Sequence, residues 1–245
     1  MIRIGLIGNG NVAYHLANAF RKSLEIELVQ QYSRSASPDF INDLGDLADA
    51  DLYIVAVSDN AIAGISTKLP FENRLVVHTS GSVPITDIVP KNRRGSFYPL
   101  QTFSKERAIN WNDVPICLEA ENEKDYQTLH HVAQTLTSRI FSISSLQRRA
   151  LHVAAVFASN FTNHLYAIAN DICNDNDVPF ETLLPLIAET AAKINVLSPP
   201  EAQTGPAIRN DINTIDAHLG FLTDERQKKI YELLTQSIQR HGKKL

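Results

Sequence analysis

The first part of the chain alternates short apolar runs with stretches whose apolar residues recur at helical spacing. One apolar run covers residues 2–7, and residues 12–20 then carry apolar side chains three and four positions apart. Further runs with the composition of strands follow at 26–32, 51–57, 75–78, 95–98, 114–119 and 139–143, several of them far enough apart for a crossover helix. This alternation predicts an α/β fold with a doubly wound, mostly parallel sheet that is buried on both faces.

The pattern changes after residue 144, where the strand signals stop. Residues 146–173 contain neither glycine nor proline, which predicts one long helix of roughly 40 Å at 1.5 Å per residue. Later helices are indicated at 180–197, 211–219 and 224–240, with breaks at Pro199-Pro200 and Gly205-Pro206. We therefore expect a sheet domain over residues 1–144 and an all-α domain over residues 145–245.

The middle of the predicted long helix, residues 151–158, is apolar on every face. A helix with no polar face needs protein on all sides, and a helical domain of this size does not supply that cover by itself. Burial between the domains or in a dimer core would satisfy it. We therefore expect a symmetric homodimer.

Composition and charge exclude several classes of protein. The 245 residues are 44% hydrophobic and 20% charged, and 27 acidic against 23 basic side chains give a net charge of −4. The chain therefore has no electrostatic footprint for nucleic acid or an anionic membrane. The two cysteines, Cys117 and Cys173, lie far apart without a C-x-x-C pairing, which argues against a disulfide framework and a cysteine zinc site, and we expect no metal. Without an apolar run of ~18 residues or a leader-like start, the sequence favours a cytoplasmic protein.

A glycine-rich turn separates the first predicted strand from the first predicted helix. The first glycine of such a turn permits the tight bend, and the second lets the backbone approach a pyrophosphate. N–H groups at the start of the helix would face the phosphates. A merely structural turn is the alternative to dinucleotide binding. The turn reads Gly8, Asn9, Gly10, Asn11, Val12 and Ala13, which fits the pattern G-x-G-x-x-A.

The end of the second predicted strand indicates which dinucleotide binds. A site that selects NAD normally has an Asp or Glu here, about twenty residues after the glycine turn, to accept from the ribose 2′-hydroxyl. This chain instead has Ser33, Arg34 and Ser35. A guanidinium between two hydroxyls suits a 2′-phosphate, so NADP is favoured. The alternative is that Arg34 is a solvated loop cation.

Two further strand ends should lie at the same edge of the sheet, where open α/β sheets bind ligands. The third strand ends in Val57, Ser58 and Asp59, and Asp59 either caps a helix, contacts the cofactor, or does both. The fourth ends in His78, Thr79, Ser80 and Gly81, whose hydroxyl and N–H groups suit a carboxylate or carbonyl. We expect cofactor contacts from Val57, Ser58, Thr79 and Ser80 and substrate contacts from Ser80 and Gly81. His78 is either catalytic or a buried, hydrogen-bonded histidine.

Several motifs accompany the glycine turn along the chain. They are VAVSD at 55–59, HTSG at 78–81, YPLQTF at 98–103, HVAAVFASNF at 152–161 and TGPAIRND at 204–211. Together they resemble those of the Rossmann-like proteins that carry a DUF2520 carboxyl-terminal domain. The resemblance spans nearly the whole chain. It implies a Rossmann fold and an NADP oxidoreductase similar in architecture to pyrroline-5-carboxylate reductase, F420-dependent NADP reductase and the 6-phosphogluconate dehydrogenase-like enzymes, and it leaves the substrate unassigned.

One departure concerns the proton donor. Hydroxyacid dehydrogenases of this architecture use a Lys and an Asn four residues apart on the long helix, but no lysine occurs here between Lys124 and Lys193. We expect His152 to replace it, because imidazole ordinarily titrates near neutral pH. Helical spacing places Ser159 and Asn160 near His152, so we predict Asn160 as catalytic and Ser159 and Asn163 as substrate contacts. A structural hydrogen-bond network is the alternative.

Arg209 precedes a predicted helix that Asp211 can cap, and it either clamps a substrate carboxylate or pairs with another helix.

Residues 1–144 are thus predicted to form an NADP-binding Rossmann domain, and residues 145–245 an α-helical domain for dimerisation and substrate binding. The predicted reaction is hydride transfer between NADP and a small carbonyl, imine or hydroxy compound. A non-catalytic dinucleotide-binding sensor or scaffold is the alternative, and a deazaflavin as hydride partner is a third possibility.

Overall fold

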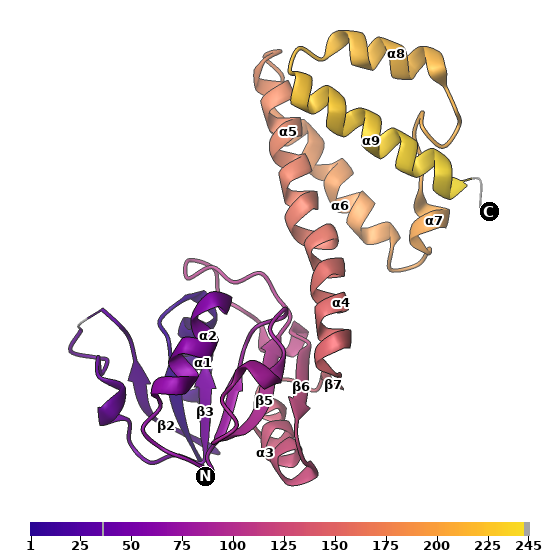
Figure 1. Ribbon diagram of the computed structural model, residues 1–245. Helices are drawn as coiled ribbons and strands as arrows, with labels where there is room; N and C mark the ends of the chain where they lie inside the picture. Colours follow the sequence, from indigo (N-terminus) through magenta and orange to yellow (C-terminus); the bar gives the residue numbers. More distant parts are fainter. Residues whose placement is uncertain (36, 243–245) are drawn as a thin grey trace. The chain divides into compact units, whose positions relative to one another are not determined.

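The computed structural model describes residues 1–35 and 37–242, without the side chains of the last two of these (Figure 1). The chain divides into two compact units, Met1–Asn160 and Phe161–Leu245, and each is described by itself.

The first unit contains one seven-stranded sheet. Its strands are β1 (Ile2–Ile7), β2 (Ile26–Tyr32), β3 (Leu52–Val55), β4 (Leu75–His78), β5 (Arg93–Pro99), β6 (Ile116–Ala120) and β7 (Ile140–Ser142). They lie in the order β2-β1-β3-β4-β5-β6-β7, and among the described strands only the β5–β6 pair is antiparallel. The prediction of a mostly parallel Rossmann sheet is therefore confirmed.

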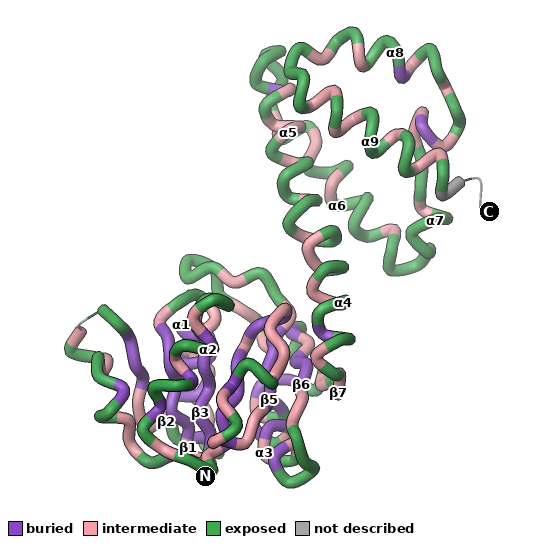
Figure 2. Tube along the Cα trace, viewed as in Figure 1, coloured by how far each residue is buried: buried purple, intermediate pink, exposed green. Residues whose placement is uncertain are grey.

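Helices cover both faces of this sheet, as a doubly wound fold requires. The helices are α1 (Asn11–Phe20), α2 (Asp59–Lys68) and α3 (Glu123–Gln134), with short 3₁₀ turns at Leu44–Asp46, Ile85–Asp87 and Trp111–Asp113. On one face, Leu16 of α1 and Leu129 of α3 pack in one core layer with Leu6 of β1. On the other face, Ile62 of α2 packs with Val55 of β3. The central strands are therefore buried on both faces, which explains their continuous apolar runs (Figure 2).

The predicted long helix forms over its expected length but is not uniform. It consists of α4 (Ser145–Ala155), the π-helical segment η4 (Val156–Phe161) and α5 (Thr162–Asn174). Ser144 caps its start through a capping box with Gln147. The first compact unit therefore extends past residue 144 into this helix, and the predicted division of roles at that residue stays a prediction.

The second unit is all-α, as predicted. Besides α5 it contains the 3₁₀ turn η5 (Phe180–Leu183) and the helices α6 (Leu184–Lys193), α7 (Pro199–Ala202), α8 (Ile212–Phe221) and α9 (Glu225–Gly242). The two prolines at which the sequence predicted a break are the first two residues of α7. They begin this helix because proline is favourable in the first helical turn. Asp211 caps α8, as expected, by accepting a hydrogen bond from the Thr214 N–H at 3.2 Å.

The described part of the second unit has a small core. Its buried hydrophobic residues are Cys173, Ala207 and Ile215. In the long helix, Val153 is 54% exposed and Phe157 is 65% exposed, and the cover expected for residues 151–158 stays a prediction. Further large apolar side chains are exposed at Phe161, Leu165, Leu186, Ile194, Val196, Phe221 and Leu233. As far as the structure describes the chain, no helix is long and apolar enough to cross a membrane.

Candidate functional site

The glycine turn lies where β1 gives way to α1, and its first residue must be glycine. Gly8 has a φ of +130°, and a Cβ atom there would lie 2.1 Å from the carbonyl oxygen of Ala56. The turn is fixed to β2, because the Gly8 N–H donates to the Tyr32 carbonyl and Gln31 Nε2 donates to the Gly8 carbonyl, both at 2.9 Å. Gln31 was not among the predicted site residues.

The second glycine leaves space at the start of α1. A Cβ atom on Gly10 would have no heavy atom within 4 Å, and Gly10 occupies the N-cap position without a side-chain cap. No acidic residue stands in the first turn of α1. The first N–H groups of the helix therefore stay available to an anionic ligand. This arrangement fits the close approach of a pyrophosphate to the backbone.

The loop after β5 is fixed against the same helix end. Asn11 Nδ2 donates to the Phe103 carbonyl at 2.7 Å, and His15 Nε2 donates to the Ser104 carbonyl at 2.8 Å. These two bonds join residues about 90 positions apart in the sequence. Asn11, which is predicted to contact the cofactor, therefore also fixes the loop after β5 through its side chain.

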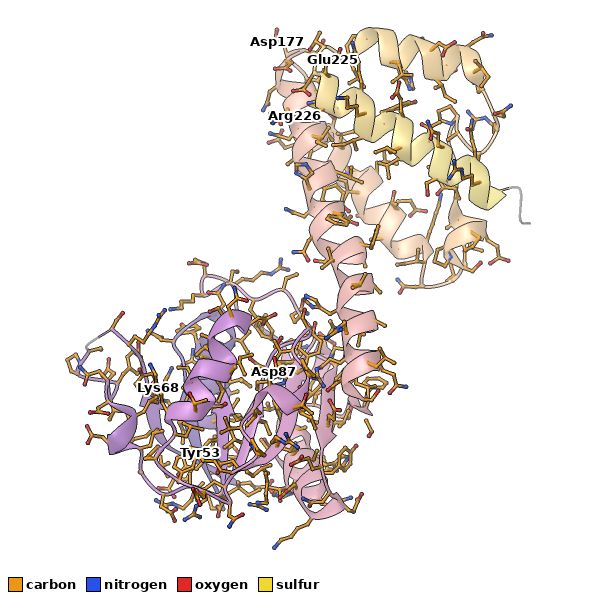
Figure 3. All side chains as sticks on the ribbon, in the orientation of Figure 1. Tyr53, Lys68, Asp87, Asp177, Glu225 and Arg226 are labelled. Carbon is orange, nitrogen blue, oxygen red and sulfur yellow. The ribbon has the colours of Figure 1, made fainter. Side chains whose placement is uncertain are left out.

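A cavity of about 760 Å³ opens between the glycine turn and the start of α2. Of the described residues that line it, none is acidic, and the two charged ones are Arg34 and Lys68. Lys68 lies at the end of α2 (Figure 3) and was not predicted from the sequence. The lining also includes Gly8, Asn9, Gly10, Asn11, Val12, Ser33, Ser35, Val57, Ser58 and Thr79.

The turn that follows β2 carries one of the two cations of the cavity, Arg34. Ser33 is buried, and its Oγ accepts a hydrogen bond from the Ser35 N–H at 3.3 Å, which holds the turn around Arg34. Arg34 itself is exposed. Together with Lys68 it makes the cavity positive, so the lining suits a ligand that carries phosphate groups.

The start of α2 differs from one of the predicted alternatives. Ser58 occupies the N-cap position without a side-chain cap, and Asp59 lies in the first turn of the helix. The interpretation of Asp59 as the N-cap is therefore wrong, because the helix begins one residue earlier than that interpretation assumed. Asp59 is exposed and is absent from the cavity lining, whereas Ser58 belongs to it.

His78 ends β4 and is completely buried. Its Nδ1 accepts a hydrogen bond from the Ser80 N–H at 3.2 Å. Burial and, secondarily, the charge of Arg148 lower the pKa of His78 to about 4, against a smaller opposing effect of the Pro84 carbonyl. His78 is therefore neutral near pH 7, and its position favours the alternative of a buried, hydrogen-bonded histidine.

A buried arginine holds the turn after β4. Arg148 of α4 is 1% exposed, and it donates to the carbonyl oxygens of Ser80 at 3.1 Å and Val83 at 2.6 Å. It also forms an ion pair with Glu119 of β6. Ser80 Oγ accepts from the N–H groups of Ser82 and Val83, each at 3.0 Å. The Ser80 side chain is thus engaged inside the turn, and its predicted ligand contacts stay predictions.

The turn also meets α4 at a tyrosine and a histidine. Tyr98 Oη, from β5, lies 3.1 Å from Nδ1 of His152. A Cβ atom on Gly81 would lie 2.6 Å from that nitrogen and 2.9 Å from Tyr98 Cζ, so Gly81 packs directly on the pair. Burial raises the pKa of Tyr98 to about 12. The structure therefore brings the predicted residues Gly81 and His152 together, and it adds Tyr98, which was not predicted.

The remaining predicted site residues lie in the π-helical segment or in the second unit. Ser159 and Asn160 lie in the π-helical segment, whose geometry changes the spacing from His152 that an α-helix would give. Asn160 is exposed. Asn163 and Arg209 belong to the second unit and are exposed too. Their catalytic and substrate-binding roles stay predictions.

Comparison with known protein families identifies the carboxyl-terminal half. The family model described as "Domain of unknown function (DUF2520)" matches residues 114–238. The resemblance inferred from the sequence motifs is therefore confirmed. Among curated proteins, none matches the chain.

Solved structures match along nearly the whole chain. A "putative NADP oxidoreductase" from Bacteroides fragilis shares 41% identity, with a TM-score of 0.89 and 98% of each chain covered. A reductive aminase from Aspergillus terreus, in complex with NADPH and ethyl levulinate, shares 13% identity at a TM-score of 0.74, with 100% of this chain and 94% of that chain covered. Pyrroline carboxylate reductase from Plasmodium falciparum, with NADP bound, shares 12% identity at a TM-score of 0.64, with 98% of each chain covered. The last two show the fold alone.

Proposed function

Because the chain belongs to the DUF2520 family, and because its sheet edge carries a positively charged cavity, we propose that it is an NADP-dependent oxidoreductase. The observation that carries the proposal is that the cavity of about 760 Å³ joins the glycine turn to Arg34 and Lys68, with no acidic residue among its described lining. The NADP and NADPH named for similar structures support the same cofactor. The proposed reaction is hydride transfer to or from a small carbonyl, imine or hydroxy compound.

The residues present fit this cofactor at both ends of the cavity. The open space at Gly10 and the uncapped start of α1 suit the pyrophosphate. Arg34, between the hydroxyls of Ser33 and Ser35, suits the 2′-phosphate, and Lys68 adds a second positive charge. When bound, NADP supplies or accepts the hydride, while the protein positions the substrate and handles the proton.

His152 is the proposed source of that proton. No lysine is available on the long helix, and the structure places His152 beside the turn that follows β4. Thr79, at the start of that turn, lines the cavity. His152→Gln should lower turnover by about 10²–10⁴-fold while the affinity for NADPH is retained. A purely structural His152 predicts instead a lower melting temperature with full activity per folded molecule.

The choice of cofactor is tested by reversing the charge at the end of β2. Arg34→Asp removes a charge-assisted contact worth roughly 1.5–3 kcal/mol, so the preference for NADPH over NADH should fall by about 10- to 150-fold. Arg226→Asp is the matched control, because Arg226 is an exposed arginine at the start of α9 in the second unit (Figure 3). An unchanged preference in Arg34→Asp would overturn the role of Arg34.

The reaction class is tested by following NADPH consumption with a panel of small carbonyl and imine compounds. Turnover with any of them supports the oxidoreductase. Tight NADPH binding without turnover on the panel supports the alternative of a sensor or scaffold, and transfer only to a deazaflavin supports a carrier reductase. The absence of a lysine donor is the observation that keeps the sensor in consideration.

We also propose a symmetric homodimer in the cytoplasm. The small core in the described part of the second unit, together with exposed apolar residues such as Leu186, Phe221 and Leu233, favours a second copy as the cover. Cys117 and Cys173 are both unpaired and buried, which fits a reducing compartment.

A further inference from the structure

The hydroxyl of Tyr98 lies beside the proposed proton source and next to the turn whose residue Thr79 lines the cofactor cavity. Tyr98 is 9% exposed, and the hydrogen-bond partner of its hydroxyl in the described structure is Nδ1 of His152, at 3.1 Å. His152 is less deeply buried. We propose that Tyr98 and His152 form a proton relay, in which the Tyr98 hydroxyl delivers the proton to the substrate and His152 recharges it from solvent. This inference rests on the proposed function, because it assigns the last step of its proton transfer.

The surroundings of the two groups set the direction of the relay. Thr79 lines the cavity, and Gly81, two residues later, packs on both rings. Tyr98 is buried whereas His152 is only partly buried, so water reaches the pair through His152. Proton uptake therefore belongs to the imidazole and delivery to the phenol.

A tyrosine alone would be a poor proton donor in this position. Burial, aided by Cys117 of β6 and opposed by Arg148 of α4, raises the pKa of Tyr98 to about 12. The side chain therefore stays a neutral phenol near pH 7 and resists forming a phenolate. A histidine at hydrogen-bond distance removes this difficulty, because it replaces the phenol proton as that proton leaves.

The step conserves protons and charge. When a carbonyl carbon accepts a hydride, its oxygen must take up one proton. The O–H bond of Tyr98 breaks toward that oxygen, while the Nδ1–H bond of protonated His152 breaks toward Tyr98 Oη. The phenol is thereby restored and His152 ends neutral, ready to take up a proton from water.

The fold holds the two groups in this geometry from two sides. Gly81 packs on both rings, and a methyl group there would come within 2.6 Å of His152 and 2.9 Å of Tyr98. Arg148, one turn before His152 on the same helix, fixes that helix to the Ser80 and Val83 carbonyls. Arg148 thus fixes the helix that carries His152, and the missing side chain of Gly81 leaves room for both rings.

The pair is tested first without any ligand. In protein labelled with ¹⁵N at histidine, the Nδ1 resonance of His152 should shift when Tyr98→Phe removes the hydroxyl. Gly81→Ala should shift it as well, because its methyl group pushes the rings apart while leaving both side chains in place. An Nδ1 resonance that neither variant moves would overturn the relay, whether or not the protein binds NADPH.

Turnover then separates the relay from direct transfer by His152. Using the panel compound that shows the fastest NADPH consumption, Tyr98→Phe should lower turnover by about 10²–10⁴-fold at an unchanged Kd for NADPH. The double variant Tyr98→Phe/His152→Gln should be no slower than Tyr98→Phe, because both residues act in one step. Full activity of Tyr98→Phe would overturn the relay and leave the proposed function standing, whereas failure to bind NADPH would count against the proposed function alone.

A second buried tyrosine provides the matched control. Tyr53 of β3 is 1% exposed, and its hydroxyl donates to the Ala48 carbonyl at 2.7 Å and accepts from the Ala50 N–H at 3.1 Å (Figure 3). It stands near the amino end of its strand, whereas Tyr98 stands near the carboxyl end of β5. Tyr53→Phe should destabilise the protein with turnover per folded molecule unchanged. An equal loss of turnover in both variants would overturn a specific role for Tyr98.

Discussion

Replacing Arg148 with methionine should destabilise the sheet unit and loosen the turn after β4. The substitution keeps a long side chain but removes the guanidinium, which donates to the carbonyls of Ser80 and Val83 and to Ser145 Oγ. It also leaves Glu119 without its ion-pair partner. The change is therefore a test of how strongly one buried cation holds α4, β6 and the turn together.

The expected magnitude follows from the burial of these partners. Breaking a buried ion pair by removing one member costs about 3–5 kcal/mol. The Glu119 side chain is 17% exposed, so water relieves part of that cost and favours the lower end of the range. Each carbonyl that loses its donor adds up to about 1 kcal/mol. We expect the free energy of unfolding to fall by about 3–5 kcal/mol, a large part of the ~5–15 kcal/mol typical of a domain.

The assay is urea unfolding followed by tryptophan fluorescence, because Trp111 is the only tryptophan of the chain and lies in the first unit. Arg149→Met is the matched control, since Arg149 is the next residue on the same helix and is exposed. We expect the control to change stability by less than about 0.5 kcal/mol. The double variant Arg148→Met/Glu119→Gln should recover about 1–2 kcal/mol by removing the unpaired carboxylate. A loss below about 1 kcal/mol in Arg148→Met, or an equal loss in the control, would refute the reasoning.

Three further outcomes are expected. Gly8→Ala should lower the free energy of unfolding by about 3 kcal/mol or more, because Gly8 has a φ of +130° and a methyl group there would clash with the Ala56 carbonyl, whereas Gly10→Ala should keep the melting temperature and weaken NADPH binding. Similar melting temperatures of the two variants would contradict this. The pKa of His78 is about 4 in the folded state against 6.5 when unfolded, so the free energy of unfolding should fall by about 2 kcal/mol as the pH falls from 7.5 to 5. Urea unfolding of His78→Asn at both pH values should lack that fall. Light scattering at micromolar concentration should give twice the 27.2 kDa chain mass, and a monomer would refute the dimer.

Local features of the sequence predicted the parts of the site that depend on neighbouring residues. Residues 8–12 of the glycine turn and Ser33, Arg34 and Ser35 follow strands whose apolar runs are easy to recognise, and these residues line one cavity. The antiparallel β6 was less predictable. Its strand is as apolar as its neighbours, and the direction depends on a connection over residues 100–115 that contains no crossover helix.

The parts that were missed depend on contacts between distant residues. Tyr98 pairs with His152 across 54 positions, and Arg148 reaches Ser80 across 68 positions. A polar residue in a strand or helix gives no local sign of such a partner, so Arg148 resembles any solvated arginine. Lys68 also reaches the cavity only through the placement of α2.

Two errors arose from local geometry. Asp59 was interpreted as a possible cap because Asp is a favoured N-cap residue, but Ser58 before it occupies that position. The spacing of His152, Ser159 and Asn160 was worked out for a regular α-helix, whereas residues Val156–Phe161 are π-helical. No glycine or proline in that segment signals the change.

Calorimetric titration of NADPH and of NADH into the unmodified protein tests the central claim most directly. The positive cavity at the glycine turn, with Arg34 at the end of β2, predicts saturable NADPH binding that is at least about 10-fold tighter than that of NADH. Equal affinities would contradict a site for the 2′-phosphate. Failure of both dinucleotides to bind would contradict the assignment of this cavity as a dinucleotide site.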